Sequence, residues 1–145
     1  MDPMQEAVAE ARAGVRNGDG GPFGAVIVKD GAILARAHNE VLKTNDPTAH
    51  AEVLAIRRAA TQLGTPHLTG CELYTTCEPC PMCLAAIHWA RLDRVIYAET
   101  RDSAARIGFD DAKFHAAMQI PIIPLEHTPS GGAAALFAEY KGERY

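Results

Sequence analysis

Two short segments of this sequence carry side chains that bind transition metals. The first is His50-Ala51-Glu52 and the second is Pro79-Cys80-Pro81-Met82-Cys83. One imidazole and two thiolates are ligands that Zn²⁺ prefers, and three protein ligands leave the fourth tetrahedral position open, as in catalytic rather than structural zinc sites. A zinc ion in such a site lowers the pKa of a bound water to about 7, which makes hydroxide available at neutral pH. We therefore expect one Zn²⁺ per chain, held by His50, Cys80 and Cys83.

Glu52 is a carboxylate that the metal does not need, so we predict that it moves protons. Taken alone, the Cys-x-x-Cys spacing could also be half of a structural zinc site or a redox motif. A structural site would need a second pair with this spacing, which Cys71 and Cys77 do not provide. A redox motif would leave His50 and Glu52 unexplained. The two segments together favour a catalytic zinc site over a non-catalytic zinc-binding module.

Length and composition restrict the class of protein. A chain of 145 residues is one domain by length, so residues 1–145 are taken as a single unit. No apolar run approaches the ~18 residues of a membrane span, and the N-terminus lacks the pattern of a secretory signal. Four cysteines are too few for a disulfide scaffold, which favours the reducing cytoplasm and buried free thiols at Cys71 and Cys77. The net charge of −4 argues against a nucleic-acid partner and favours a small neutral substrate.

Periodicity and turn signals predict the elements that position these residues. Helices are predicted at 3–17, with Asp2 as its cap, and at 49–63, 81–91, 111–118 and 133–141. Strands are predicted at 23–28, 32–37, 71–75, 94–98 and 120–125, the last an edge strand because it contains prolines. Both zinc-binding segments then lie in the first turns of helices, where the helix dipole favours thiolates. The alternation of strands and helices predicts a mixed sheet with helices on both faces. Residues 128–132 are predicted as a hinge-like turn.

Four segments, at 20–31, 45–52, 77–83 and 108–111, resemble the bacterial guanine deaminases of the cytidine-deaminase fold. The second segment, Asn-Asp-Pro-Thr-Ala-His-Ala-Glu, is also similar to tRNA adenosine deaminases. The Gly-Phe-Asp-Asp segment and the short tail ending in Tyr145 are not similar to those tRNA enzymes. The least similar stretch is 110–132. The His-x-Glu and Pro-Cys-x-x-Cys pair is itself the signature of zinc-dependent deaminases.

This resemblance implies an α/β protein, a three-layer α/β/α sandwich with a mixed sheet of about five strands. It implies a homodimer in which residues 131–145 cross to the neighbouring subunit. It also implies hydrolytic deamination of guanine to xanthine and ammonia. In that reaction Glu52 would take a proton from the attacking water, pass it to a ring nitrogen beside C2, and carry a second proton to the departing amine.

The resemblance further implies a set of substrate-binding residues. They are Phe23, Asn39, Ala51 through its backbone N–H, Trp89, Asp111 and Tyr145 from the tail. Guanine presents N1–H and N2–H donors side by side, which suits a carboxylate, whereas N1 of adenine is an acceptor. Phe23 and Trp89 are equally interpretable as core residues, and Asn39 as a turn residue. Whether Asp110 or Asp111 contacts substrate stays open. So does a different amino-heterocycle: guanosine, cytosine, tRNA adenosine or an aminotriazine.

Overall fold

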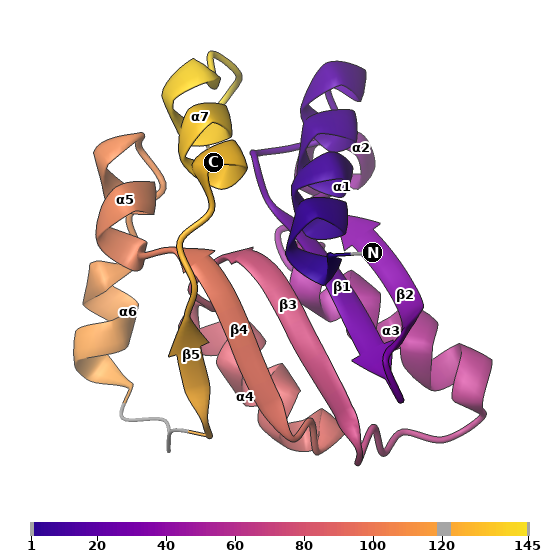
Figure 1. Ribbon diagram of the computed structural model, residues 1–145. Coiled ribbons are helices and arrows are strands. Elements are labelled where there is room, and N and C mark those ends of the chain that lie inside the picture. Colours follow the sequence, from indigo (N-terminus) through magenta and orange to yellow (C-terminus); the bar gives the residue numbers. More distant parts are fainter. Residues whose placement is uncertain (1, 119–122, 145) are drawn as a thin grey trace.

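The computed structural model describes residues 2–118 and 123–144 of the chain. The helices are α1 (Pro3–Asn17), α2 (Val41–Thr44), α3 (Ala51–Leu63), α4 (Pro81–Ala90), α5 (Arg101–Arg106), α6 (Ala112–Ala117) and α7 (Gly131–Glu139). The strands are β1 (Gly24–Lys29), β2 (Ala32–His38), β3 (Cys71–Cys77), β4 (Arg94–Glu99) and β5 (Leu125–His127). Figure 1 shows the strands side by side in one sheet with helices packed against it.

The sheet has five strands in the order β2-β1-β3-β4-β5. Strand β1 pairs antiparallel with both β2 and β3, whereas β3, β4 and β5 run parallel. Helix α4 connects β3 to β4, because parallel neighbours need a crossover connection. The sheet is therefore mixed, as the sequence predicts.

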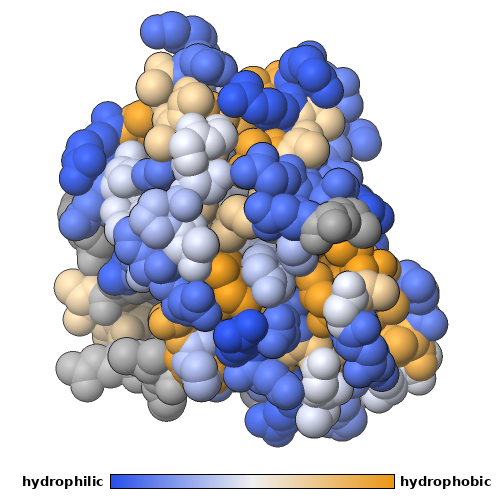
Figure 2. Space-filling model, in the orientation of Figure 1, coloured by the Kyte–Doolittle hydropathy of each residue, from blue (hydrophilic) through white to orange (hydrophobic). Residues whose placement is uncertain are grey.

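Both faces of the sheet are buried, which makes the fold a three-layer sandwich. Along β1, Ala25 and Ile27 pack in one cluster with residues of α3 and α4, and Val26 and Val28 pack in a second cluster with residues of α1 and α7. Side chains of a strand alternate between its two faces, so an unbroken apolar strand needs cover on both sides. Helix α1 buries only one of its own faces, and Figure 2 shows hydrophilic residues over most of its outer surface. The predicted fold class is confirmed.

The helix boundaries near the site differ slightly from the prediction, and the difference bears on the chemistry. Helix α3 begins at Ala51, so His50 is its N-cap and does not lie in the first turn. Cys80 is likewise the N-cap of α4. N-cap residues have extended backbone dihedrals, here ψ 152° at His50 and ψ 168° at Cys80. Two of the three predicted ligands therefore stand just ahead of their helices.

The last third of the chain departs most from the sequence-based expectation. Helix α5 was not predicted, although Thr100 caps it by accepting a hydrogen bond from the Ser103 amide. The predicted strand at 120–125 overlaps residues outside the described part of the chain, and the strand that the structure describes, β5, begins only after Pro124, which has no N–H to donate to a neighbouring strand. It is an edge strand, as predicted. The glycine pair at 131–132, expected in a turn, opens α7.

Candidate active site

The three predicted zinc ligands come together where the N-termini of α3 and α4 meet. His50 Nδ1 lies 3.6 Å from Cys80 Sγ and 3.5 Å from Cys83 Sγ. The three ligand atoms all lie within 4.8 Å of one another. The sequence left open which imidazole nitrogen faces the metal, and this geometry selects Nδ1. The donor set is one nitrogen and two sulfurs, which is one of the three-ligand sets found in zinc sites with an open fourth position.

The electrostatics of this cluster also fit a divalent cation. The hydrogen bond from the Cys83 thiol, opposed by burial and aided by His50, lowers the pKa of Cys80 to about 4. The same hydrogen bond and burial raise the pKa of Cys83 well above its ordinary value. Burial alone would lower the pKa of His50, but the hydrogen bond with Cys80 and the charge of Glu52 outweigh it and raise that pKa. One sulfur is thus already a thiolate, and the residues present fit a zinc ion.

Glu52 is held against the ligand cluster by hydrogen bonding. Its side chain is buried, with the residue only 6% exposed. Oε1 accepts a hydrogen bond of 2.7 Å from Thr75 Oγ1, and Oε2 lies 3.1 Å from Cys83 Sγ. Thr75 is fully buried in β3, and sequence reasoning missed it because a threonine in a strand carries no distinctive signal. The carboxylate is therefore fixed beside the ligands without being needed as one.

A pocket of about 460 Å³ opens beside the cluster. It falls in the size range of small-molecule sites. Of the predicted residues it brings together Phe23, Asn39, His50, Glu52, Cys80 and Asp111. Further lining residues come from α2, the segment before α3, the end of β3, the Cys-x-x-Cys segment, α5, the loop after α5, and α6 with its C-cap: Val41, Pro47, Cys77, Glu78, Pro81, Met82, Arg101, Ala104, Phe109, Asp110, Phe114 and Met118.

One side of the pocket is formed by Phe23, Asn39 and Val41, which we call the recognition wall. The Phe23 ring makes edge contacts with Phe109 at 5.0 Å and with Phe137 of α7 at 5.7 Å between ring centroids. Asn39 is 1% exposed, and its Oδ1 accepts a hydrogen bond of 3.0 Å from the Val41 amide. The wall thus has an aromatic ring and a side-chain amide whose oxygen is fixed.

Two carboxylates line another side of the pocket, Asp110 and Asp111. Burial and then the charge of Cys80 raise the pKa of Asp111, and Asp111 in turn helps to raise the pKa of His50. Asp111 lines the same pocket as His50 and Cys80. Sequence reasoning missed Arg101, which lines the pocket and pairs with Glu78 at 3.2 Å. Its signal was weak, since a single arginine after a strand is usually a surface residue.

The structure does not bring every predicted substrate residue to the pocket. Trp89 is 77% exposed and is not among the residues that line the pocket. It follows Cys83 by six positions, which turns it by about 240° around the axis of α4. A single chain therefore does not place Trp89 against a bound purine. Ala51 is fully buried behind His50 and Glu52 and does not line the pocket, and Tyr145 lies outside the described residues.

Comparison with known proteins agrees with this site. Residues 2–99 match the model of the cytidine and deoxycytidylate deaminase zinc-binding region. The chain therefore belongs to the cytidine and deoxycytidylate deaminase family of zinc-binding proteins. The fold and the His/Cys/Cys cluster are those that this family description leads one to expect.

Within the family, the chain is similar to guanine deaminases. It is 60% identical over 109 residues to guanine deaminase of Bacillus subtilis strain 168, an alignment that covers 75% of this chain and 70% of the relative. The X-ray structure of guanine deaminase from Bacillus subtilis superposes with a TM-score of 0.79 and 48% identity, over 95% of this chain and 92% of that one. A structure of guanine deaminase from Nitrosomonas europaea gives a TM-score of 0.83 at 30% identity, over 94% and 81% of the two chains. The resemblance noted in the sequence is confirmed. Within the described residues, no helix combines the length and apolar character needed to cross a membrane.

Proposed function

We propose that this chain is a guanine deaminase, which hydrolyses guanine to xanthine and ammonia. The observation that carries the proposal is one pocket lined by two zinc ligands, Glu52 and Asp111 in a chain 60% identical to a guanine deaminase over 109 residues. The products balance the reactants: water supplies the oxygen at C2, one of its protons ends on the ring nitrogen beside C2, and the other joins the exocyclic NH2 as it leaves as ammonia.

The metal ligands, Glu52 and Thr75 have different roles in the proposed reaction. A zinc ion bound by His50, Cys80 and Cys83 would supply an activated water and polarise the attacked centre. Glu52 takes the proton that the water gives up and delivers it to the ring nitrogen beside C2. It then transfers a second proton to the amine as the carbon–nitrogen bond breaks. The hydrogen bond from Thr75 holds one carboxylate oxygen in place, and the other lies 3.1 Å from Cys83 Sγ, on the side of the proposed metal.

Substrate recognition rests on the remaining pocket residues. Asp111 is an acceptor suited to the adjacent N1–H and N2–H groups of guanine. Asn39 can hydrogen-bond the O6 and N7 edge, and Phe23 offers a ring face or edge to the base. The Ala51 backbone N–H and Tyr145 complete the proposed set. Adenine presents a lone pair at N1, so the Asp111 carboxylate would repel it.

A substrate panel tests the proposal. Zinc-loaded protein is assayed for ammonia release from guanine, guanosine, cytosine, an aminotriazine and a tRNA adenosine stem-loop. Guanine should give the highest kcat/KM of the five. The tRNA alternative is represented among the relatives, one of which is the tRNA-specific adenosine deaminase of Aquifex aeolicus, 47% identical over 95 residues. The acidic net charge of −4 disfavours it. Faster release from any other member of the panel would replace guanine as the substrate.

We also propose a homodimer that exchanges residues 131–145. Helix α7 buries Ala133, Leu136 and Phe137 against the rest of the fold, and an exchanged helix makes the same contacts on the neighbouring chain. Trp89, an exposed aromatic on α4, is a side chain that a second copy would cover. The four cysteines are free thiols, which supports the cytoplasm as the compartment.

Complementation tests the exchange directly. One variant is full-length Glu52→Ala, and the other lacks residues 142–145 but keeps Glu52. Each alone should be inactive. In a mixed dimer, one pocket would combine an intact Glu52 with the neighbour's tail, so refolding the two together should restore up to one active pocket per dimer. Mixed dimers that form and stay inactive would assign the tail to its own chain.

A further inference from the structure

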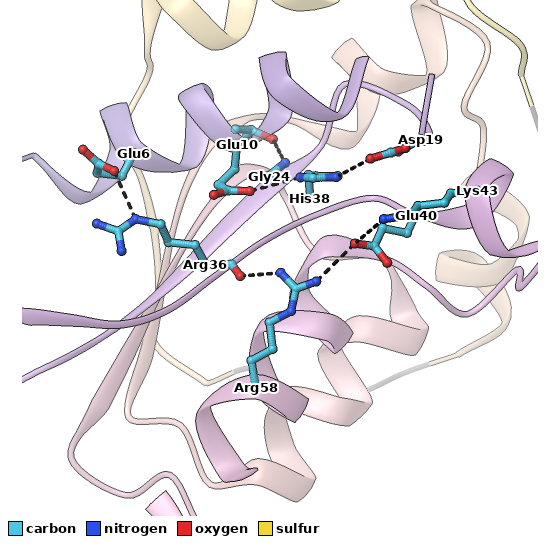
Figure 3. Close-up of polar contacts among 10 residues, drawn as sticks. Glu6, Glu10, Asp19, Gly24, Arg36, His38, Glu40, Lys43 and Arg58 are labelled. Atoms are coloured by element: carbon cyan, nitrogen blue, oxygen red, sulfur yellow. Dashed lines mark hydrogen bonds and ion pairs between the residues drawn. The ribbon is translucent and has the colours of Figure 1, made fainter. Parts of the chain in front are cut away.

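A histidine outside the pocket is held between two carboxylates. His38, the last residue of β2, has Nδ1 3.0 Å from Glu10 Oε2 of α1 and Nε2 2.8 Å from Asp19 Oδ2 of the loop after α1. Figure 3 shows the imidazole lying in line between the two acids. All three side chains are largely buried, with 13% of His38, 25% of Glu10 and 11% of Asp19 exposed. The proposed reaction uses none of these residues.

Both contacts are hydrogen bonds at once only in particular proton arrangements. An ionised carboxylate has no proton to donate, so it accepts from the ring or makes no bond. A ring with one proton donates from one nitrogen and accepts at the other, whereas a ring with a proton on each nitrogen donates to both carboxylates. His38 thus ties α1, β2 and the loop at 18–22 together at one point.

This point lies directly behind the recognition wall of Phe23, Asn39 and Val41. Asn39 is the residue after His38, and its amide donates a hydrogen bond of 3.0 Å to the Phe23 carbonyl. The carbonyl of Asp19 accepts hydrogen bonds of 3.0 Å from the amides at 42 and 43, in the helix that begins at Val41. Asn39 is therefore connected to His38 through the chain, Phe23 through its hydrogen bond with Asn39, and the helix of Val41 through its hydrogen bonds with Asp19.

Two glycines make room for this arrangement. A Cβ at Gly14, in the last turn of α1, would lie 2.7 Å from His38 Cδ2 and 2.9 Å from its Cγ. A Cβ at Gly20 would collide with Asn39 Oδ1. A glycine inside a helix is less stable than alanine, so position 14 gives up helix stability where the imidazole approaches. The sequence therefore accommodates His38 and Asn39 as a unit.

We propose that His38 is a positioning residue for purine recognition. Its bonds to Glu10 and Asp19 fix the recognition wall, and it takes no part in the proton transfers. The inference rests on the proposed deaminase function of the pocket, because it concerns how that pocket binds its base. In this proposal Glu10, Asp19 and His38 influence the affinity for the base although none of them lines the pocket.

The first test is His38→Ala in the zinc-loaded enzyme. Alanine leaves space for water to solvate the carboxylates of Glu10 and Asp19, so we expect the variant to fold. Losing the two hydrogen bonds that order the wall should raise the KM for guanine about tenfold. The zinc content should not change, and kcat should stay within about threefold, since Glu52 and the zinc ligands lie on other elements.

A second pair of variants, at Asp19, separates the hydrogen bonds of His38 from the negative charge of Asp19. In Asp19→Asn the amide N–H can donate to Nε2 while Nδ1–H donates to Glu10, so a neutral ring keeps both contacts. This variant should hold KM within about threefold of wild type, whereas Asp19→Ala, which loses one contact, should approach the KM of His38→Ala. Rescue by the amide is a result that general destabilisation does not produce.

Glu6→Gln is the matched control. Glu6 lies on α1, as Glu10 does, and pairs at 3.1 Å with Arg36, which stands two residues before His38 in β2. The two side chains of this pair are more exposed than those around His38. Its KM should equal that of wild type. A lowered Tm with unchanged KM in His38→Ala would overturn the inference, as would a fall in kcat at constant KM. A wild-type enzyme that does not deaminate guanine contradicts the proposed function instead, and the same KM comparison is then made with the base that the panel identifies.

Discussion

The pocket has two sides built in different ways. The zinc side comes from two helix N-termini and one strand, and its residues lie in the short segments 50–52, 75 and 80–83. The recognition side is assembled from segments far apart in the sequence: Phe23, Asn39 and Val41, then Phe109 to Met118. The family match ends at residue 99, so the second group lies beyond it. Under the proposed function, the chemistry would be fixed by local segments, and the choice of base would depend on long-range packing.

Removing a zinc ligand should have the largest effect, because the zinc side functions as a whole or not at all. In Cys83→Ser a hydroxyl replaces a thiolate, and it is a poor zinc ligand at neutral pH. We expect the variant to lose both bound zinc and ammonia release from guanine. Metal analysis of the purified protein and the activity assay check this together. A variant with full zinc and full turnover would remove Cys83 from the site.

Glu52→Gln should separate metal binding from proton transfer on the same side. The amide keeps the shape of the side chain but cannot accept and return a proton. Zinc content should equal that of wild type, while kcat falls by about 10²–10⁴-fold, the usual contribution of general acid–base catalysis. Thr75→Val, which removes the hydrogen bond to Oε1, should lower kcat by a smaller factor. Near-normal turnover in Glu52→Gln would contradict the proposal that Glu52 transfers protons.

On the recognition side, Asp111→Asn should weaken guanine binding without affecting zinc. The lost charge-assisted hydrogen bond is worth about 1.5–3 kcal/mol, roughly a 10–150-fold fall in kcat/KM. Asp110→Asn is the matched control, since both carboxylates line the pocket. If the control loses activity and Asp111→Asn does not, the neighbouring carboxylate is the one that binds guanine.

The same carboxylate predicts a pH dependence. Burial and the Cys80 charge raise the pKa of Asp111 above its ordinary value of 3.8. As the pH falls through this raised value, the carboxylate takes up a proton and ceases to be a pure acceptor. The KM for guanine should therefore rise on the acid side in wild type, at a pH above 3.8, and this rise should be absent in Asp111→Asn. A KM profile over pH at constant zinc loading measures it.

The smallest effect is expected at Trp89, which lies on neither side of the pocket. Trp89→Ser should change kcat/KM by no more than about twofold at high protein concentration, as most exposed substitutions do. It should weaken self-association, which analytical ultracentrifugation measures. A large loss of activity in a variant that still forms dimers would show that the tryptophan reaches a pocket through the partner chain.

The contrast between the two sides also explains what the sequence could predict. His50, Glu52, Cys80 and Cys83 are recognisable because metal ligation restricts residue type and spacing. The strands expected at 23–28 and 32–37 and the Asp2 cap of α1 follow from local signals and are confirmed. Trp89 lies outside the pocket of a single chain, and its predicted contact with substrate stays a prediction, because a helix position fixes a direction only once the partner surface is known.

Other residues had no local signal at all. Thr75 and Arg101 act through contacts with Glu52 and Glu78, which lie 23 positions away in each case. Helix α5 is a single short element whose only marker is its Thr100 cap. Such contacts arise when the sheet brings separate segments together, so they become visible only with the fold.

Gly14, in the last turn of α1, sets helix propensity against side-chain packing. By helix propensity alone, Gly14→Ala is a substitution that an engineer would choose to make the protein more heat-resistant, with a gain of about 1 kcal/mol. A Cβ there would lie 2.7 Å from His38 Cδ2, so the ring would have to move, and Asn39 follows it in the chain. A substitution chosen from the helix alone would therefore lose in the packing of His38 what it gains in the helix.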